Sequence, residues 1–354
     1  MFFVYIERLA IYMKHRKILF EIFFIFLSFF LISPSCKKVN EKIPLEKSKG
    51  VFIREKGDIE KVDAYAQYIA PILLEDIKGK EKYFDIRIEN YKSLYLGAPF
   101  RVYGKTEDNV IYYPVYEGDT IKLILTVLEK NGKWNAVLGR SWSEDFEEIH
   151  GNATRIVTKN ECSICVEPYD ENVVYPNNNI SVEEFSPDIS LSNLFFSSGD
   201  SKLLGTPDNY KNQKDEKGNT RGMCWAASIA TTINCRTGSD VTAQEICEEM
   251  KIPLDEGVRY PKKEEALKKH GISVASISRR LNWSEIKENI SDNRPIMVSL
   301  YSENEAHAVT IVGYSEKEEK MIYVWDSVSG FSIKTYTPYF TLNGNIWEWW
   351  HSMF

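Results

Sequence analysis

Three apolar runs near the end of the chain constrain its fold more than any other feature. They read RPIMVSLY (294–301), HAVTIVGY (307–314) and MIYVWD (321–326). Each is rich in β-branched and aromatic residues and is bounded by polar residues, a pattern typical of strands. The short connections between the runs favour hairpins. The sequence therefore predicts an antiparallel sheet at the C-terminal end.

Helix signals precede these strands. Thr242 and Glu245 have the spacing of a capping box. Pro261 opens a charged segment that Gly271 ends, and Asn282 marks the start of WSEIKENI. Residues 210–354 therefore begin with helices and finish as a sheet, which predicts an α+β fold.

A single cysteine lies where the first of these helices should begin, in RGMCWAASIATTINCRTG (221–238). Arg221-Gly222 is typical of a loop, the alanines and isoleucines that follow favour a buried helix, and Gly238 is a plausible C-terminal cap. Cys224 would then lie at a helix N-terminus, which lowers a thiol pKa. The alternative is a small buried hydrophobic residue, the commonest role of a free cysteine.

Among the five histidines, His307 is distinctive because it opens an apolar strand. A hairpin with the loop 315–318, pairing Tyr314 with Glu319, would place His307 directly opposite Asp326. Such partners point to the same face and lie close together. A carboxylate beside an imidazole fixes its tautomer and leaves the other ring nitrogen for a thiol. A slip of one residue would turn the two side chains to opposite faces.

The segments CWAASIATTI, HAVTIVGY and VWD, together with the ending NGNIWEWWHSMF, resemble papain-like cysteine peptidases. Staphopains and bacteriocin-leader peptidases are the most similar in their compact size and order of motifs. The resemblance covers about residues 210–354. It implies that Cys224 is the nucleophile, His307 the base and acid, and Asp326 the orienting group. It implies a protein or peptide substrate and neither a metal nor an organic cofactor. Trp325 is expected to cover the His–Asp pair.

The chain departs from this pattern at the oxyanion hole. Such enzymes carry a glutamine about six residues before the cysteine, where this chain has Gly218. We expect Gln213 to supply the oxyanion donor, with DEKGN (215–219) as an extra loop. Asn219 is the alternative donor.

The N-terminal half predicts a smaller β-rich domain with one helix at 51–165. The helix is expected over 58–78. Strands are expected at YFDIRIE (83–89), APFRVY, VIYYPVY and across the Asn131-Gly132 hairpin turn. A linker is expected at 166–209, where Pro, Asn and Ser accumulate. By analogy with the resembling families, this domain is expected to be a prodomain, which would make the chain a zymogen; a permanent spacer and a substrate-binding module are the alternatives.

Residues 1–36 predict a signal peptide, with the pattern beginning at Met13. A basic region precedes an apolar run of eleven residues, 22–32, too short to span a membrane. Lipid on Cys36 would make the protein a membrane-anchored bacterial lipoprotein at the cell surface; plain secretion is the alternative. Cys162 and Cys165 could form a local disulfide, stay inert, act as a redox pair or supply half a metal site.

The remaining composition narrows the function. The formal charge of −7 is spread along the chain, which argues against a nucleic-acid partner. The sequence predicts a secreted or lipid-anchored cysteine endopeptidase and does not determine its oligomeric state. Its competitors are a transglutaminase-like acyl transferase, a cell-wall amidase, a non-catalytic surface-binding protein on the same fold, and apolar motifs that are only core.

Overall fold

The structure is a computed structural model. It describes residues 52–55, 59–97, 99, 110–141, 143, 154–160, 163–168, 180–183, 189–190, 199–302, 305–342 and 345–354. The predictions for the signal peptide, Met13, Cys36 and Cys162 lie outside these residues, as does most of the strand expected at 98–103. Within them, no helix combines the length and apolarity needed to cross a membrane.

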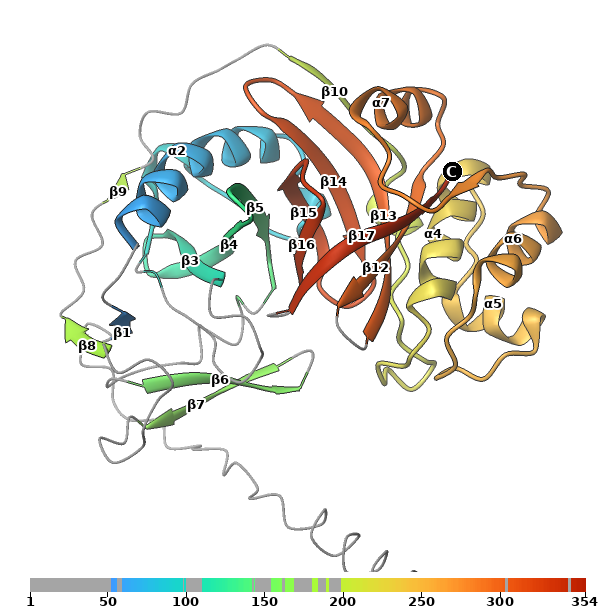
Figure 1. The fold of residues 1–354 in the computed structure, drawn as a ribbon, viewed down its shortest axis with the longest axis horizontal. Helices are drawn as coiled ribbons and strands as arrows, with labels where there is room; N and C mark the ends of the chain where they lie inside the picture. The colour runs from blue at the N-terminus through green and yellow to red at the C-terminus, as the bar shows by residue number, and fades with distance from the viewer. Residues whose placement is uncertain are drawn as a thin grey trace, which may run out of the picture. The chain divides into compact units, whose positions relative to one another are not determined.

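The central feature of the fold is one large sheet that combines strands from both halves of the chain. Its strand order is β11–β17–β12–β13–β14–β15–β5–β4–β3–β2–β9, with β10 paired to β13 and β16 paired to β17. Its strands can be followed in Figure 1. Their bounds are β2 (Leu94–Leu96), β3 (Val110–Glu117), β4 (Thr120–Lys130), β5 (Lys133–Gly139), β9 (Ile189–Ser190), β10 (Asp200–Leu203), β11 (Ser276–Ile277), β12 (Ile296–Ser302), β13 (Glu305–Glu316), β14 (Lys320–Asp326), β15 (Gly330–Thr335), β16 (Tyr339–Leu342) and β17 (Asn345–Met353).

Four further strands form a small second sheet in the order β7–β6–β1–β8. They are β1 (Phe52–Glu55), β6 (Thr154–Asn160), β7 (Ser163–Pro168) and β8 (Ile180–Glu183). β6 and β7 form an antiparallel pair, while β1 runs parallel to β6.

The helices begin and end where local signals predict. The described helices are α2 (Ile59–Ile77), α4 (Cys224–Thr237), α5 (Ala243–Met250), α6 (Tyr260–Lys269) and α7 (Trp283–Ser291), with short 3-10 turns η1 (Glu81–Tyr83), η2 (Tyr91–Ser93) and η3 (Pro207–Asn209). The capping boxes at Thr242, before α5, and at Asn282, before α7, are both formed. Gly238 caps α4 at φ 72°. Residues 210–354 are thus a mixture of helices and antiparallel sheet, as expected.

Helices cover both faces of β12. Met297 joins α4, α5 and α6 in one apolar core. Val298 and Leu300, which point to the opposite face because side chains alternate along a strand, pack with α7 in another. The sheet that carries His307 is therefore buried on both sides, and its position relative to α4 is fixed by packing.

In the N-terminal half, the hairpin at Asn131-Gly132 is confirmed. β4 and β5 pair across it, and both turn residues have positive φ, 54° and 70°. The strand expected at YFDIRIE is wrong. η1 occupies its start, and Asp85 has φ 51°, which interrupts an extended chain. Phe84 is nevertheless buried there.

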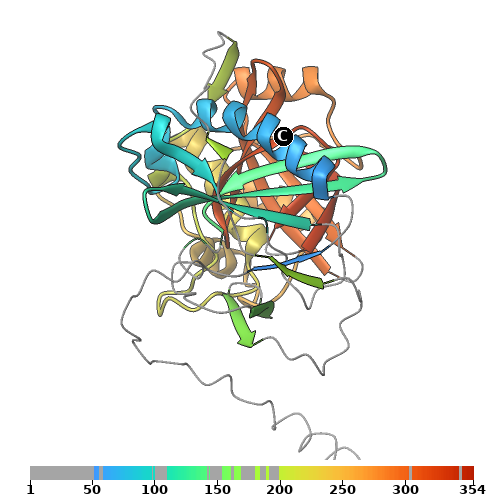
Figure 2. The ribbon, with the colours of Figure 1, turned by 90° about the vertical axis from the view of Figure 1, so that its left-hand side faces the viewer.

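The β-rich N-terminal strands are continuous with the C-terminal sheet, because β5 pairs with β15 through Ser332–Lys334. Figure 2 shows α2 lying across the strands β3–β5, and its apolar side packs with Tyr323 and Ile333 of β14 and β15. Part of the expected linker is also in the sheet, since β10 pairs with β13. The domain boundaries at 165 and 209 stay predictions.

Candidate active site

Cys224 is the first residue of α4 and is half-buried. The loop before it is held by Asp255, which accepts a hydrogen bond from the Gly222 N–H at 3.0 Å and pairs with Arg221 at 2.5 Å. A Cβ on Gly222 would lie 3.0 Å from the Asp255 backbone, so the close approach favours glycine. Trp225 anchors the next turn by donating to the Glu256 carbonyl at 2.9 Å. These contacts fix the thiol at the helix N-terminus.

His307 and Asp326 are hydrogen-bonded. Nε2 of His307 lies 3.1 Å from Oδ1 of Asp326, whose side chain is fully buried. The carboxylate also accepts from the Val328 N–H at 2.8 Å and from the Ser329 hydroxyl at 2.9 Å. These partners hold the carboxylate in place. Because Asp326 takes Nε2, Nδ1 of the ring is left for the Cys224 thiol.

The register that joins these residues differs from the expected one. Glu316 pairs with Lys320, so the turn is 317–319, and Val309, rather than His307, lies directly opposite Asp326. The difference is two positions. Residues two apart share a face, and the diagonal partner is within reach of a long side chain. His307 and Asp326 therefore still meet.

A β-bulge makes this possible. Between Ile311 and Gly313 the pairing of β13 with β14 shifts by one residue, which leaves Val312 as the extra residue. If the regular ladder from Glu316 to Gly313 continued, Asp326 would face Thr310. His307 lies an odd number of positions from Thr310, so its side chain would be on the other face of the sheet.

The charges of the site favour a thiolate–imidazolium pair. Burial alone would raise the pKa of Cys224, but its hydrogen bond to His307 and the charges of His307 and Lys263, with the Ala308 backbone, lower that pKa. Burial alone would lower the pKa of His307, but the charge and hydrogen bond of Asp326 and the contact with Cys224 raise it well above its ordinary value. The pKa of Asp326 is lowered: burial opposes this shift, and the charge of His307 drives it.

The aromatic ring beside His307 belongs to Trp347, with ring centroids 5.6 Å apart. Trp325, expected in this role, instead packs on Tyr210 at 5.3 Å and donates to the Lys211 carbonyl at 2.8 Å. Sequence reasoning missed Trp347 because it comes from β17, whose pairing with β12 is a matter of tertiary structure.

Gln213 lies next to the cysteine loop despite its distance in sequence. A bridge between Lys214 and Thr220 closes the residues 215–219 into a loop, and the Arg221 N–H donates to the Gln213 carbonyl at 2.8 Å. The Gln213 side-chain amide donates to the Arg221 carbonyl at 2.5 Å and accepts from the Ser327 hydroxyl at 2.8 Å. Its nitrogen carries a second hydrogen, which has no protein acceptor in the described part of the chain.

Asn219, the alternative donor, is held within that loop. Its side-chain nitrogen donates to both carboxylate oxygens of Asp215, at 3.2 and 3.1 Å, and its backbone N–H donates to the same group at 2.8 Å. The geometry favours Gln213 over Asn219 as the amide available beside Cys224.

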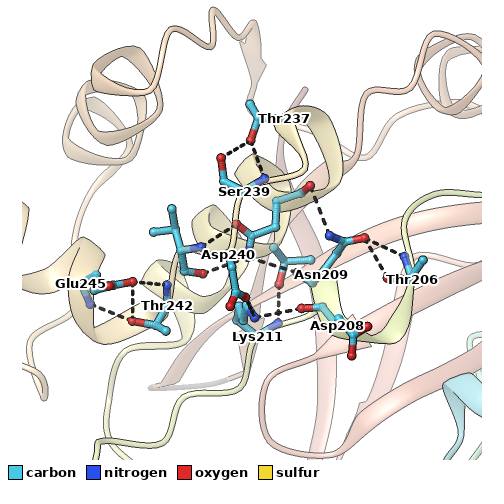
Figure 3. A network of polar contacts seen from close by, with 12 residues as sticks. Thr206, Asp208, Asn209, Lys211, Thr237, Ser239, Asp240, Thr242 and Glu245 are labelled. Atoms are coloured by element: carbon cyan, nitrogen blue, oxygen red, sulfur yellow. Dashed lines mark hydrogen bonds and ion pairs between the residues drawn. The ribbon is translucent and has the colours of Figure 1, made fainter.

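A polar network holds the segment that leads to Gln213, as Figure 3 shows. Asn209 accepts from the Thr206 N–H at 2.7 Å, and Lys211 Nζ donates to the Asp208 carbonyl at 2.8 Å and pairs with Asp240. The Lys211 N–H donates to the Thr231 hydroxyl of α4 at 3.0 Å. The segment is thereby fastened to the helix that begins with the cysteine.

Sequence reasoning missed a buried lysine near the cysteine. Lys263 of α6 is 7% exposed, and its Nζ donates to the Ser299 hydroxyl at 3.2 Å. Its signal was the spacing of Lys263 with Ala266 and Leu267, the buried residues of α6. That spacing places Lys263 on the apolar face of the helix.

Two further cysteines, Cys235 and Cys247, differ from Cys224. Cys235 and Cys247 are free, and burial raises their pKa values, to about 12 for Cys235 and, with the Glu248 charge, to about 11 for Cys247. Within the described residues there is no cluster of three or more His, Cys, Asp or Glu side chains suited to a metal ion.

The structure thus brings a thiol, an imidazole and a carboxylate together, in the chain order Cys224, His307, Asp326. In a comparison with protein families, residues 209–351 match the Peptidase_C39 like family. This similarity supports a papain-like cysteine peptidase for the C-terminal region, and the matched segment contains all four predicted site residues. The staphopain-like features remain predictions. A comparison with curated proteins finds no significant match.

Proposed function

We propose that the protein is a secreted or lipid-anchored cysteine endopeptidase that hydrolyses peptide bonds with Cys224, His307 and Asp326. The observation that carries the proposal is the hydrogen bond of 3.1 Å between His307 and the buried Asp326, beside a thiol whose pKa His307 lowers. A nucleophile, a base and a group that orients the base are the parts that acyl transfer requires.

Each residue has a defined part in the reaction. The Cys224 thiolate attacks the peptide carbonyl carbon, and the charge that develops on the oxygen is held by the Cys224 backbone N–H and by the second amide hydrogen of Gln213. His307 then donates its proton to the leaving amine, the carbon–nitrogen bond breaks, and the acyl group stays on the Cys224 sulfur as a thioester. Water then attacks the thioester while His307 takes its proton, which releases the acid and restores the thiolate.

The first experiment compares the purified protein with the variants Cys224→Ala and Cys247→Ala on denatured casein and with an epoxide that alkylates active-site thiols. We expect casein cleavage and labelling of Cys224 by the parent and by Cys247→Ala. The Cys224→Ala variant should do neither, because it lacks the nucleophile. Mass spectrometry identifies both the labelled residue and the cleaved bonds.

A folded parent protein that neither labels nor cuts would contradict the peptidase. Labelling without casein cleavage, together with transfer to an added amine or cleavage of muropeptides, would favour the acyl transferase or the amidase. Export is a separate part of the proposal. In cells fed a labelled fatty acid, we expect the parent protein to carry the label and the Cys36→Ser variant to lack it.

A further inference from the structure

Lys263 is a buried cation without an acidic partner. Its Nζ contacts the neutral Ser299 hydroxyl at 3.2 Å and lies 5.6 Å from the centroid of the Tyr260 ring. The neighbouring lysines of α6 differ, since Lys262 pairs with Glu265 and Lys268 with Glu264, both at 2.8 Å. Among the described residues, no carboxylate forms an ion pair with Lys263. A buried lysine in this state is rare unless another charge compensates it.

Packing directs Lys263 to the nucleophile. It shares the buried face of α6 with Ala266 and Leu267, which join the core formed by α4. Its partner Ser299 lies opposite Ala308 in the pairing of β12 with β13. Ala308 follows His307, and its backbone hydrogen-bonds with Cys224. Lys263 therefore reaches the site from the helix side, whereas His307 reaches it from the sheet.

From this placement we infer that Lys263 is a positioning residue that stabilises the Cys224 thiolate as a second cation beside the imidazolium. The inference rests on the proposed function and deepens it. An opposite charge within a few ångströms, in a setting shielded from water, favours the ionised form of each partner. The ammonium thus supports the thiolate without exchanging a proton with substrate.

The surrounding groups leave Lys263 as the second charge at this position. Lys263 and Cys224 influence each other: burial lowers the pKa of Lys263, and the Cys224 charge opposes that shift. His351 of β17 is kept neutral, because burial and the Lys263 charge lower its pKa to about 4. Tyr260 has a raised pKa through burial, and Cys247 of α5 is a neutral thiol. The carboxylate of Asp326 balances the positive charge of His307.

The test measures the pH dependence of Cys224 alkylation by iodoacetamide, between about pH 4 and pH 10, by peptide-resolved mass spectrometry. The variants Lys263→Met and Lys263→Gln remove the charge, and Lys263→Gln keeps a donor for Ser299. In both, we expect the midpoint to rise by about one pH unit, or tenfold less thiolate on the acid side. In Lys263→Arg, which keeps the positive charge, the midpoint should stay close to that of the parent protein. Lys262→Met, which removes the charge of an exposed neighbouring lysine, should leave the midpoint of Cys224 alkylation unchanged.

The outcomes separate the inference from the proposed function. If the parent protein alkylates with the midpoint of an ordinary thiol, about 8.5, the thiolate–imidazolium site is wrong. If the parent has a lowered midpoint that the neutral variants keep, the role of Lys263 is wrong and the peptidase stands. If only one neutral variant folds, that variant decides. A shift in Lys263→Arg as large as in Lys263→Gln would assign the effect to packing rather than charge.

Discussion

At the scale of single residues, the site depends on groups that only folding brings into hydrogen-bonding distance. Asp326 has three donors and no exposed surface, so its charge is available only to His307 and to the turn that holds it. Gln213 is fixed from both ends of its amide, by Arg221 and Ser327. The effects that we predict for substitutions at these two residues can be separated by pH and by rate.

Asp326→Asn should move the basic limb of the pH–activity profile to lower pH. The raised pKa of His307, which the Asp326 charge causes against the effect of burial, keeps the imidazolium present until the pH rises through that value. Removing the charge lowers the value, so activity is lost earlier, by about one pH unit or more. Steady-state rates across pH measure this. Ser329→Ala, which keeps the charge, should shift the limb much less, and an unmoved limb in Asp326→Asn would contradict the assignment.

Gln213→Ala should reduce kcat by about 100-fold with little change in KM, because an oxyanion donor acts mainly in the transition state. Its matched variant is Asn219→Ala, whose amide donates to Asp215 instead and whose activity should be close to that of the parent. Peptide hydrolysis kinetics distinguish the two. The reverse ranking would assign the oxyanion hole to Asn219.

At the scale of elements, the bulge in β13 decides which side chains share a face. Val312 is fully buried, and its carbonyl accepts from the Leu204 N–H at 2.8 Å. On the side of β13 away from β14, β12 pairs up to Ile311 and β10 begins at Gly313. The extra residue therefore sits at the junction of two neighbours, where neither ladder is interrupted.

Deleting Ile311 and Val312 together should abolish activity while leaving a folded protein, whereas deleting Val312 alone should keep activity. Without Val312 the ladder between β13 and β14 becomes regular and Val309 still lies opposite Asp326. Without both residues, Ala308 takes the place opposite Asp326, which turns His307 to the other face of the sheet. Val312→Ala keeps the bulge and should stay active, with a lower melting temperature because of the cavity it leaves. Hydrolysis rates and circular dichroism melting curves measure both. Full activity in a folded variant that lacks both residues would show that the register of β13 does not position the pair.

Elements with strong local signals could be predicted: the helices with capping boxes at Thr242 and Asn282, and the hairpin at Asn131. The strand expected at 83–89, which had only an alternating pattern, was wrong. Pairing could not be predicted. The exact turn and the bulge lie at the two ends of the pairing of β13 with β10, which joins residues more than a hundred positions apart. The burial of Lys263 likewise follows from how α6 packs on α4. The pairing of His307 with Asp326 was expected for the right face but in the wrong register.

At the scale of the whole molecule, a buried carboxylate connects the N-terminal helix to the C-terminal sheet. Asp76 of α2 is fully buried and accepts from the Ser315 hydroxyl at 2.9 Å and the Tyr323 hydroxyl at 3.0 Å. Lys317 pairs with it at 3.0 Å. The connection adds to the pairing of β5 with β15, so we expect both halves of the chain to unfold together.

Calorimetry should therefore give one unfolding transition for α2, β3–β5 and the catalytic region. Asp76→Ala should lower the free energy of unfolding by about 2–5 kcal/mol, because it leaves two buried hydroxyls and a cation without their acceptor. Gln67→Ala, an exposed change on the same helix, should have little effect. Two separate transitions, with only the first moved by Asp76→Ala, would contradict the shared fold.

The pairing of β5 with β15 also bears on how the catalytic region could be obtained alone. A cut before Gly199 would divide the polypeptide and leave both pieces bound to each other, so maturation by a cut alone would release nothing. A recombinant fragment starting at residue 210 would lack β5 and present the edge of β15, with Phe331 and Ile333 uncovered from their shared core. Unpaired apolar edges recruit strands from other chains. Such a fragment would collect in inclusion bodies, and adding the N-terminal piece during refolding would keep it in solution.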